Sequence, residues 1–310
     1  MSTRAENRAA AAHHKVAAAR RFPNEALLLV PAVIFVVATV VYPLLYNISQ
    51  SFFDIGIAEI VSGAGKWVGF ENYADQLQRP EFWAALGISV SYTAATVVLS
   101  VIVALLLAQL FQLNIPGRDY MRALILLAWI IPTVISANVW RWLLDGSYGL
   151  LNGMLRMFGI IDGDVFWLGE PVTAFIAVVA ASVWTFAPLG MILLTAGLQS
   201  IPHSLYEAAM VDGASRWQRF LNITVPALKP VLYTTAFLLF IYTFKTFDTI
   251  FLMTGGGPGG ATKILPVYAY EQAFIFFKFG KAAVATTILL VIPTVLSILY
   301  FHSIKKEERS

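Results

Sequence analysis

Long apolar stretches separated by short polar segments make up most of this sequence, and each stretch is long enough to cross a membrane as a helix. About 20 helical residues span the roughly 30 Å hydrocarbon core of a bilayer. Six such stretches occur, and only the fifth contains charges, Lys245 and Asp248. They cover residues 26–48, 86–111, 123–140, 172–198, 231–253 and 282–304. The pattern predicts an all-α membrane protein with six transmembrane helices.

Five prolines lie inside these stretches and predict kinked helices, not interrupted spans. In a membrane bundle, neighbouring helices and side chains pair the backbone groups that a proline leaves free, and sharp bends occur at prolines. These prolines are Pro31, Pro43, Pro132, Pro188 and Pro293.

The composition supports the same class. Of 310 residues, 58% are hydrophobic and 13% are charged, whereas soluble domains average about 25% charged residues. The absence of cysteine excludes disulfide frameworks, thiolate metal sites and cysteine nucleophiles.

Lysine and arginine set the orientation, because they are more frequent on the cytoplasmic side of membrane proteins. A cytoplasmic N-terminus places thirteen of them inside and seven outside. We therefore expect cytoplasmic tails at residues 1–25 and 305–310 around a six-span domain of residues 26–304. The first apolar run is too long for the core of a signal peptide and has no small-residue cleavage site, so we expect it to remain as a span.

Residues 202–230, between the fourth and fifth spans, form a polar segment far longer than a connection requires. Ser204 and Glu207 have the spacing of a capping box, which predicts a helix that starts there. Asp212 and Gly213 predict its end. In the expected orientation this segment is cytoplasmic.

A second short helix is predicted directly after this corner. Ser215 and Gln218 fit a second capping box, and Pro226 predicts the end of the helix. One side of it is apolar and another is basic, with Arg216 and Arg219. From the pattern alone, the two helices form either a partner-binding surface or an amphipathic hairpin at the lipid headgroups. A DNA-binding helix-turn-helix is disfavoured, because the flanking spans hold the segment at the bilayer.

The spacing of this segment resembles the EAA loop of binding-protein-dependent ABC importers. In that pattern Glu-Ala-Ala is followed four positions later by Gly and then, after nine residues, by Ile-x-Leu-Pro. Val225 replaces the Leu. The matching residues are Glu207, Ala208, Ala209, Gly213, Ile223 and Pro226.

Three further stretches are similar to carbohydrate importer permeases of the maltose and glycerol-phosphate type: VGFENYADQL, IIPTVISANVWRWLLDGSYGLLN and FKTFDTIFLMTGGGPGGAT. The TGGGP sequence is typical of the first of two different permeases. The resemblance implies a type I ABC importer permease fold in the bacterial inner membrane, a second and different permease subunit, two ATPase subunits and a periplasmic binding protein. The substrate it implies is a sugar, polyol or modified sugar.

In that family the EAA loop docks into a cleft of the ATPase and transmits its closure to the spans. The resemblance implies this role for Glu207, Ala208, Ala209, Asp212, Gly213, Trp217, Phe220, Ile223 and Pro226. Which side of the loop faces the ATPase stays open, and Glu207 is alternatively only a helix cap.

The segment TGGGPGGATK resembles a phosphate-binding loop but lacks its defining residues. That loop has Gly immediately before the Lys and Ser or Thr after it, whereas Thr262 precedes Lys263 and Ile264 follows it. We interpret the glycines as a turn on the outer side. The chain is then expected to hold no nucleotide, cofactor or metal, and ATP and Mg²⁺ are expected on the ATPase subunits.

The charges of the fifth span are the best candidates for the translocation path. Lys245 and Asp248 lie three residues apart on one helical face, and a lone charge at a helix centre costs about 2.5–3.5 kcal/mol. They form either an internal ion pair or a substrate contact. Further candidates for the path are Tyr242, Trp184, Asn138 and Tyr92, each with helix packing as the alternative role.

Two other classes of function lack support in the sequence. A secondary carrier has internal repeats and its own coupling-ion site, and no repeat is visible between the halves of the chain. A membrane enzyme needs an acid–base or metal cluster within the spans. The four histidines lie in the tails, at a membrane edge or in the loop.

Overall fold

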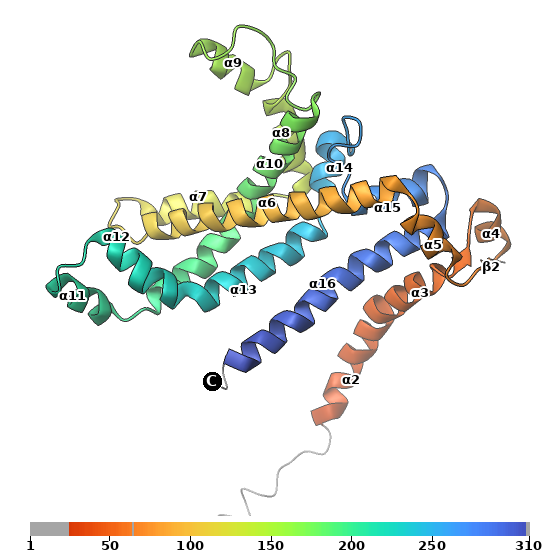
Figure 1. Ribbon diagram of the computed structural model, residues 1–310, viewed down its shortest axis with the longest axis horizontal. Coiled ribbons are helices and arrows are strands. Elements are labelled where there is room, and N and C mark those ends of the chain that lie inside the picture. The colour runs from red at the N-terminus through yellow and green to blue at the C-terminus, as the bar shows by residue number, and fades with distance from the viewer. Residues whose placement is uncertain (1–24, 64, 308–310) are drawn as a thin grey trace, which may run out of the picture. The chain divides into compact units, whose positions relative to one another are not determined.

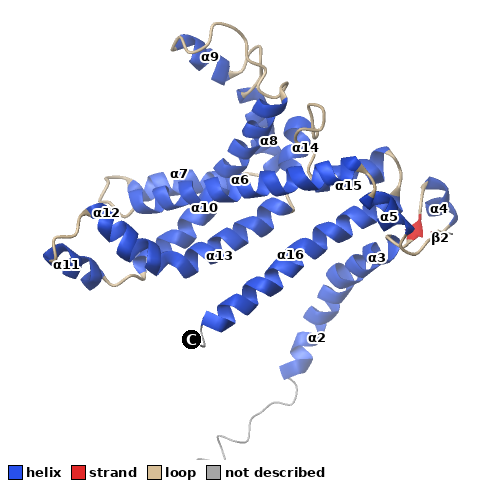
Figure 2. Cartoon of the chain, in the orientation of Figure 1, coloured by secondary structure: helices blue, strands red, loops and turns tan. Residues whose placement is uncertain are grey.

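The computed structural model describes residues 25–63 and 65–307, and most of them are helical (Figures 1 and 2). Residues 1–24 and 308–310, which hold most of the two predicted tails, lie outside the described residues. The chain divides into two compact units, Met1–Ser49 and Gln50–Ser310. The first unit holds the first predicted span, and the second unit holds the others.

The first predicted span is a continuous helix. It consists of α2 (Glu25–Val36), the π-helical turn η1 (Val37–Val41) and α3 (Tyr42–Gln50), and residues Leu29–Gln50 are long and apolar enough to cross a membrane. The Tyr42 N–H bonds to the Val37 carbonyl. This wider turn comes directly before Pro43, whose ring would clash with the carbonyl of an ordinary α-helical turn.

Three long helices of the second unit pack against one another: α6 (Pro80–Leu110), α10 (Pro171–Gln199) and α13 (Val225–Phe244) (Figure 1). Gly190 on α10 lies so close to α6 that a Cβ there would be 2.8 Å from the Cβ of Ala104. Small residues at such seams let membrane helices approach closely, and the resulting dispersion contacts replace the hydrophobic effect that lipid does not supply.

A fourth long helix, α16 (Phe279–Glu307), is the predicted sixth span. The second, fourth and sixth spans are confirmed as single helices, because Pro80–Leu110, Pro171–Gln199 and Phe279–His302 have the length and composition to cross a membrane. Both α10 and α16 continue through their internal prolines, Pro188 and Pro293.

The third predicted span is not a straight helix. It consists of α7 (Arg118–Ile130) and α8 (Thr133–Leu143), which are bent by 99° relative to each other. The break lies at Ile131 and Pro132, and Ile131 is extended (ψ 131°), as the residue before a proline prefers. In the part of the chain that the structure describes, five helices are therefore long and apolar enough to span, or six if the bent pair is one span.

The fifth predicted span, residues 231–253, is also broken. Helix α13 ends at Phe244, and a separate helix α14 (Asp248–Thr254) begins after a break of three residues, 245–247. Asp248 lies in the first turn of α14, where a carboxylate interacts favourably with the helix dipole and favours a new start. The span instead extends in the other direction, because Arg216–Phe244 forms one continuous helical stretch.

Shorter elements connect the long helices. Strands β1 (Phe53–Asp54) and β2 (Lys66–Trp67) form an antiparallel pair in which Phe53 lies opposite Trp67. The remaining elements are α4 (Ile57–Ser62), α5 (Glu71–Leu77), α9 (Leu150–Met157), α11 (His203–Val211), α12 (Arg216–Arg219), η2 (Phe220–Thr224), α15 (Leu265–Tyr270) and η3 (Glu271–Ile275).

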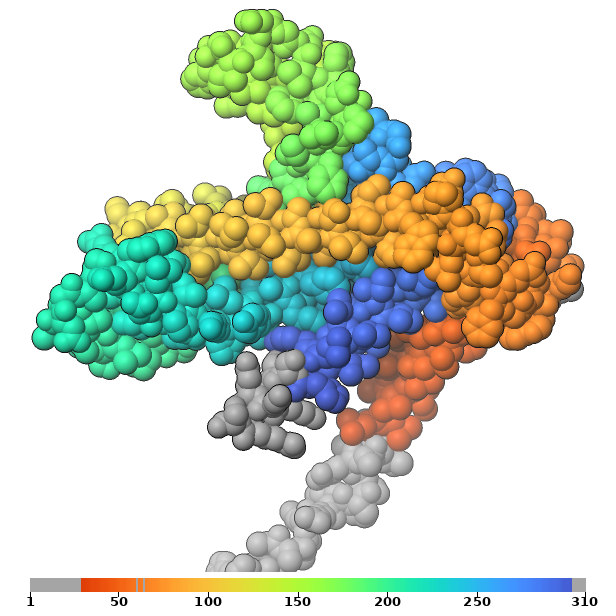
Figure 3. Space-filling model, in the orientation of Figure 1, coloured from red at the N-terminus to blue at the C-terminus, as the bar shows by residue number. Residues whose placement is uncertain are grey.

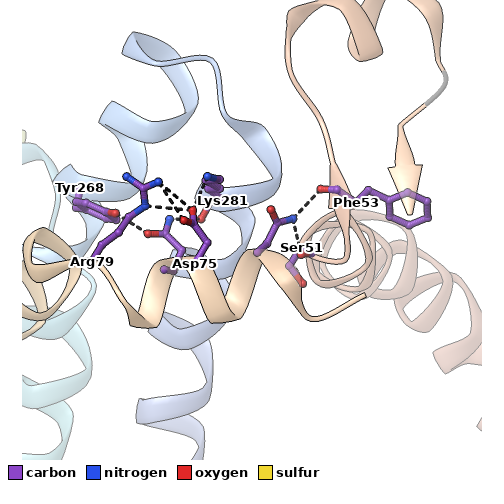
Figure 4. Close-up of polar contacts among 8 residues, drawn as sticks. Ser51, Phe53, Asp75, Arg79, Tyr268 and Lys281 are labelled. Carbon is purple, nitrogen blue, oxygen red and sulfur yellow. Dashed lines mark hydrogen bonds and ion pairs between the residues drawn. The ribbon is translucent and has the colours of Figure 1, made fainter. Parts of the chain in front are cut away.

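Two buried amides of α5 join this helix to three other segments (Figure 4). The Asn72 Nδ2 group donates to the carbonyls of Ser51 at 3.0 Å and Phe53 at 2.8 Å. The Gln76 Nε2 group donates to the Lys281 carbonyl at 3.1 Å, and the Tyr268 hydroxyl donates to Gln76 Oε1 at 2.6 Å. Since Asn72 and Gln76 are buried, these bonds fix the β1 strand, α15 and the start of α16 around α5.

An ion cluster covers the same junction. The Asp75 carboxylate accepts hydrogen bonds from Lys281 and, at 3.0 Å, from Arg79 (Figure 4). The Lys281 hydrogen bond, helped by Arg79 and opposed by burial, holds the pKa of the Asp75 carboxyl below its usual value. Next to Lys281, a Cβ on Gly280 would lie 2.1 Å from the Phe53 carbonyl. Only glycine therefore lets α16 approach the β1 strand this closely.

We expect Gln76→Leu to lower the free energy of unfolding by about 1–3 kcal/mol, because it removes the buried partner of both the Lys281 carbonyl and the Tyr268 hydroxyl. Thermal unfolding of the full-length chain in detergent measures this change. Gln78→Leu is the matched control, since Gln78 is exposed at the end of the same helix. Equal destabilisation by both changes would contradict the role of the buried amide.

Candidate functional site

The first loop helix, α11, begins at His203 and not at the predicted capping box. Pro202 is the residue before the helix and makes no side-chain cap. Its carbonyl accepts the first bond, from the Leu205 N–H at 3.2 Å. The interpretation of Ser204 and Glu207 as a cap is therefore wrong. Glu207 lies inside the helix, with its carboxylate 3.2 Å from His203 Nδ1, and its side chain is 66% exposed.

The predicted corner at Gly213 is confirmed as a Schellman motif. Asp212 ends α11, and Gly213 has the left-handed φ of +78°. The Ala214 N–H bonds to the Ala209 carbonyl at 2.8 Å, and the Gly213 N–H bonds to the Met210 carbonyl at 3.1 Å, which are the two bonds of that motif. A Cβ on Gly213 would meet no atom within 4 Å. Backbone conformation alone therefore restricts this position.

The second capping box is confirmed, but the predicted end of its helix is wrong. The Gln218 N–H donates to Ser215 Oγ at 3.3 Å, and the Ser215 N–H donates to Gln218 Oε1 at 2.8 Å. From there α12, η2 and α13 continue as one helical stretch. The π-helical bond from the Val225 N–H to the Phe220 carbonyl widens the turn before Pro226. The proline is thereby tolerated inside the helix.

A side-chain bond joins the two arms of the loop. The Tyr206 hydroxyl on α11 lies 2.9 Å from the Thr224 hydroxyl of η2, and Thr224 is buried. The loop is therefore attached to the fifth span by continuous backbone, by the Schellman corner and by this bond. A displacement of the loop has to move the span.

The predicted coupling residues differ in exposure. Trp217 is 67% exposed, and its ring lies 5.4 Å from that of Phe220. The exposed members are Glu207, Ala208, Asp212, Gly213, Trp217 and Pro226, and the half-buried members are Ala209, Phe220 and Ile223. Ala209 supplies the carbonyl of the Schellman motif, so it has a structural role within the loop itself.

The two broken spans meet at one cavity of about 300 Å³. Its lining includes Ile131 from the break between α7 and α8, and Lys245, Thr246 and Phe247 from the break between α13 and α14. Irregular backbone at membrane depth is tolerated where it lines a cavity or is buried in protein. The sequence indicated neither break as a site, although Pro132 marked the position of one of them.

The cavity brings together three of the predicted path residues, Tyr242, Lys245 and Asp248. Lys245 and Asp248 are both exposed, and neither has an ion-pair partner among the residues that the structure describes. The hypothesis of an internal ion pair is therefore wrong for this chain, because the helix breaks between the two residues. The Lys245 ammonium instead lies 5.1 Å from the centre of the Tyr242 ring.

The other three predicted path residues lie elsewhere. Trp184 lines a separate apolar cavity on α6 and α10. Asn138 donates to the Val134 carbonyl of its own helix at 2.7 Å. Tyr92 is 1% exposed and its hydroxyl lies 2.6 Å from the Ser182 hydroxyl. Sequence reasoning missed Thr133 and Thr185, which do line the cavity of Lys245.

The glycine-rich segment after α14 is a turn, as predicted. Gly255, Gly256, Gly259 and Gly260 all have positive φ. The lysine that suggested a phosphate-binding loop, Lys263, forms an ion pair with Glu271 at 2.8 Å.

Comparison with known proteins now identifies the family. Residues 96–308, most of the second unit, match the family described as "Binding-protein-dependent transport system inner membrane component". The chain belongs to this family. Membership agrees with the resemblance of residues 202–230 to the EAA loop of ABC importers. It argues against a secondary, ion-coupled carrier.

Several named relatives align with most of this chain. It is 40% identical to the trehalose/maltose transport system permease protein MalF of Thermococcus litoralis over 73% of this chain and 74% of the relative. The diacetylchitobiose uptake system permease protein DasB of Streptomyces coelicolor is 34% identical over 91% and 87%. The sulfoquinovosyl glycerol transport system permease protein SmoG of Agrobacterium fabrum is 32% identical over 91% and 90%.

Solved structures show the fold. A chain of a bacterial ABC transporter involved in the import of alginate superimposes with a TM-score of 0.77 at 22% identity, covering 90% of this chain and 94% of that chain. A chain from a bacterial alginate ABC transporter in complex with an alginate pentasaccharide-bound periplasmic protein superimposes with a TM-score of 0.75 at 22% identity. The match covers 89% of this chain and 92% of that chain. The predicted type I importer permease fold is thus confirmed.

We expect Gly213→Val to reduce the protection of the corner's backbone amides against hydrogen exchange, because a β-branched residue disfavours positive φ by about 1–2 kcal/mol. Amide hydrogen exchange of the full-length chain, read by mass spectrometry on peptides of residues 203–219, should accelerate roughly tenfold. Gly213→Asn is the matched control, since Asn adopts the left-handed conformation more readily and there is space for its side chain. Unchanged protection in the valine variant would contradict the corner's dependence on φ.

Proposed function

We propose that this chain is the permease subunit that forms half of the translocation path of an ABC importer for a sugar, polyol or modified sugar. Family membership supports the transport role. The observation that carries the mechanism is the exposed corner at Gly213, which lies three residues before the continuous helical stretch Arg216–Phe244. We place the chain in the bacterial inner membrane with both termini in the cytoplasm, as its distribution of basic residues favours.

In this proposal two separate ATPase subunits bind the loop of residues 202–230. The loop presents large apolar side chains to solvent, including Val211 at 88% and Trp217 at 67% exposure, and a protein partner would remove this surface from water. ATP and Mg²⁺ are held by the ATPase subunits, and this chain binds no cofactor, no metal and no nucleic acid. Closure of the ATPase pair then pulls the loop and, through it, the fifth span.

The substrate enters the path at the cavity of Lys245. Hydroxyl groups of Thr133 and Thr185, the Tyr242 ring and the two exposed charges line it, and sugars are recognised by such hydrogen-bonding groups around an aromatic face. Relatives named for trehalose/maltose, diacetylchitobiose and sulfoquinovosyl glycerol support this substrate class. A second, different permease supplies the other half of the path, and a periplasmic binding protein delivers the substrate.

We expect the purified full-length chain to release no phosphate from ATP, whereas the complex with its ATPase subunits does. In that complex, Gly213→Val should lower substrate uptake per ATP hydrolysed at least several-fold, because the corner transmits closure to the span, and Gly213→Asn should remain near the unchanged chain. Phosphate release by the chain alone would refute the separate ATPase.

We expect Lys245→Met and Asp248→Asn each to reduce uptake several-fold while changing stability by no more than about 1 kcal/mol, since both side chains are exposed and neither forms an ion pair within the described residues. Uptake in proteoliposomes and thermal unfolding measure the two effects. Lys66→Met, an exposed change in β2, is the control. Normal uptake in both variants would remove these residues from the path.

A further inference from the structure

A second cavity, of about 780 Å³, lies between the loop and the ends of α6 and α10. In Figure 3 the loop helices (teal) lie beside the segment that follows α6 (yellow). Residues lining the cavity come from that segment, from the end of α10 and from α11, α12 and η2, but Glu207, Ala208 and Trp217 are not among them. Phe220 is the one predicted coupling residue that lines it, so the cavity is otherwise separate from the exposed surface that we assign to the ATPase.

Two arginines give this cavity a positive charge that nothing in the described chain balances. Arg216 and Arg219 both line it, and no carboxylate does. Neither arginine forms an ion pair within residues 25–63 and 65–307. Of the two acids of the loop, Glu207 lies 3.2 Å from His203, and Asp212 does not line the cavity.

One of these guanidinium groups also has an unmet hydrogen bond. The Arg219 Nε atom is buried and has no hydrogen-bond partner in the part of the chain that the structure describes. Burial of an unpaired donor is unfavourable, more so when it belongs to a charged group. An anionic ligand in the cavity would accept this bond and neutralise the charge.

The rest of the lining indicates a ligand with an apolar part. Leu113, Leu198 and Phe220 contribute apolar surface, and the cavity lies where two membrane-crossing helices, α6 and α10, end. A bilayer crossed by α6 and α10 would have its headgroups near these helix ends. Basic pockets between transmembrane helices on the cytoplasmic side bind the headgroups of anionic lipids.

We propose that this cavity binds the phosphate group of an anionic membrane lipid, with Arg216 and Arg219 as its ligands and the acyl chains along the ends of α6 and α10. The amides of Gln109 and Gln112, which also line the cavity, are placed to contact the polar headgroup. The bound lipid fills the space behind the loop and so connects its position to the bilayer. This site requires neither the sugar substrate nor the ATPase of the proposed function.

Native mass spectrometry of the full-length chain in detergent tests the proposal, with phosphatidylglycerol and phosphatidylcholine of identical acyl chains as probes. We expect tighter binding of phosphatidylglycerol, and a loss of roughly tenfold or more in its affinity in the Arg216→Gln/Arg219→Gln variant. Lys229→Gln is the matched control, because it removes an exposed basic residue of the same helical stretch outside the cavity. Phosphatidylglycerol should bind the Lys229→Gln variant as tightly as it binds the unchanged chain.

The Arg216→Lys/Arg219→Lys variant, which keeps both charges, should retain most of the binding and so separates the loss of the site from misfolding. Equal affinity for the two lipids, or equal losses in the glutamine and Lys229→Gln variants, would overturn the proposal. Displacement of phosphatidylglycerol by millimolar inorganic phosphate would assign the site to a soluble phosphate compound instead. Unchanged lipid binding with impaired ATPase assembly in the glutamine variant would assign the arginines to the ATPase.

Discussion

The lipid environment requires every backbone N–H and C=O group in a span to find a partner within the protein, and the rest of this structure depends on that constraint. Where a proline removes a donor, the described spans differ in how they respond, and α10 and α16 simply continue through Pro188 and Pro293. Before Pro43 and Pro226 a π-helical turn keeps the helix continuous. At Pro132 the helix breaks, as it also does at residues 245–247, and both breaks line the same cavity. Irregular backbone is thus concentrated where polar side chains surround a space.

Because the helix continues through Pro226, one helical stretch connects the loop of residues 202–230 to the cavity of Lys245. The stretch Arg216–Phe244 has 29 residues, about 43 Å of helix at roughly 1.5 Å per residue. It begins directly after the Ser215 cap beside the corner and ends at Phe244, directly before Lys245 of the cavity. Because a helix transmits displacement along its axis, the loop of residues 202–230 and the candidate substrate cavity lie at the two ends of one rigid element. The Tyr206–Thr224 bond adds the first loop helix to it.

Features with a local physical cause were predictable from the sequence. The apolar runs located the spans, and Gly213 with Ser215 located the corner, since positive φ and side-chain caps depend on neighbouring residues only. The cap at Glu207, the end at Pro226 and the pair of Lys245 with Asp248 were wrong for a common reason. Each assumed regular α-helical geometry, whereas Pro202, the π turn and the break at residues 245–247 shift the backbone. The cavity itself needs contacts between three segments, residues 129–133, 185–186 and 242–249, that no local pattern contains.

The exposed charges at the cavity also indicate what has to surround this part of the chain in a membrane. An uncompensated charge in contact with lipid is costly, by up to about 2.5–3.5 kcal/mol at the centre of a span. Lys245 and Asp248 are exposed at the break between α13 and α14, and the cation–π contact with Tyr242 offsets only about 1 kcal/mol of that cost. A functional assembly therefore has to cover this cavity with another polypeptide or fill it with water. Both conditions agree with the proposal that this cavity lines a translocation path shared with a second permease.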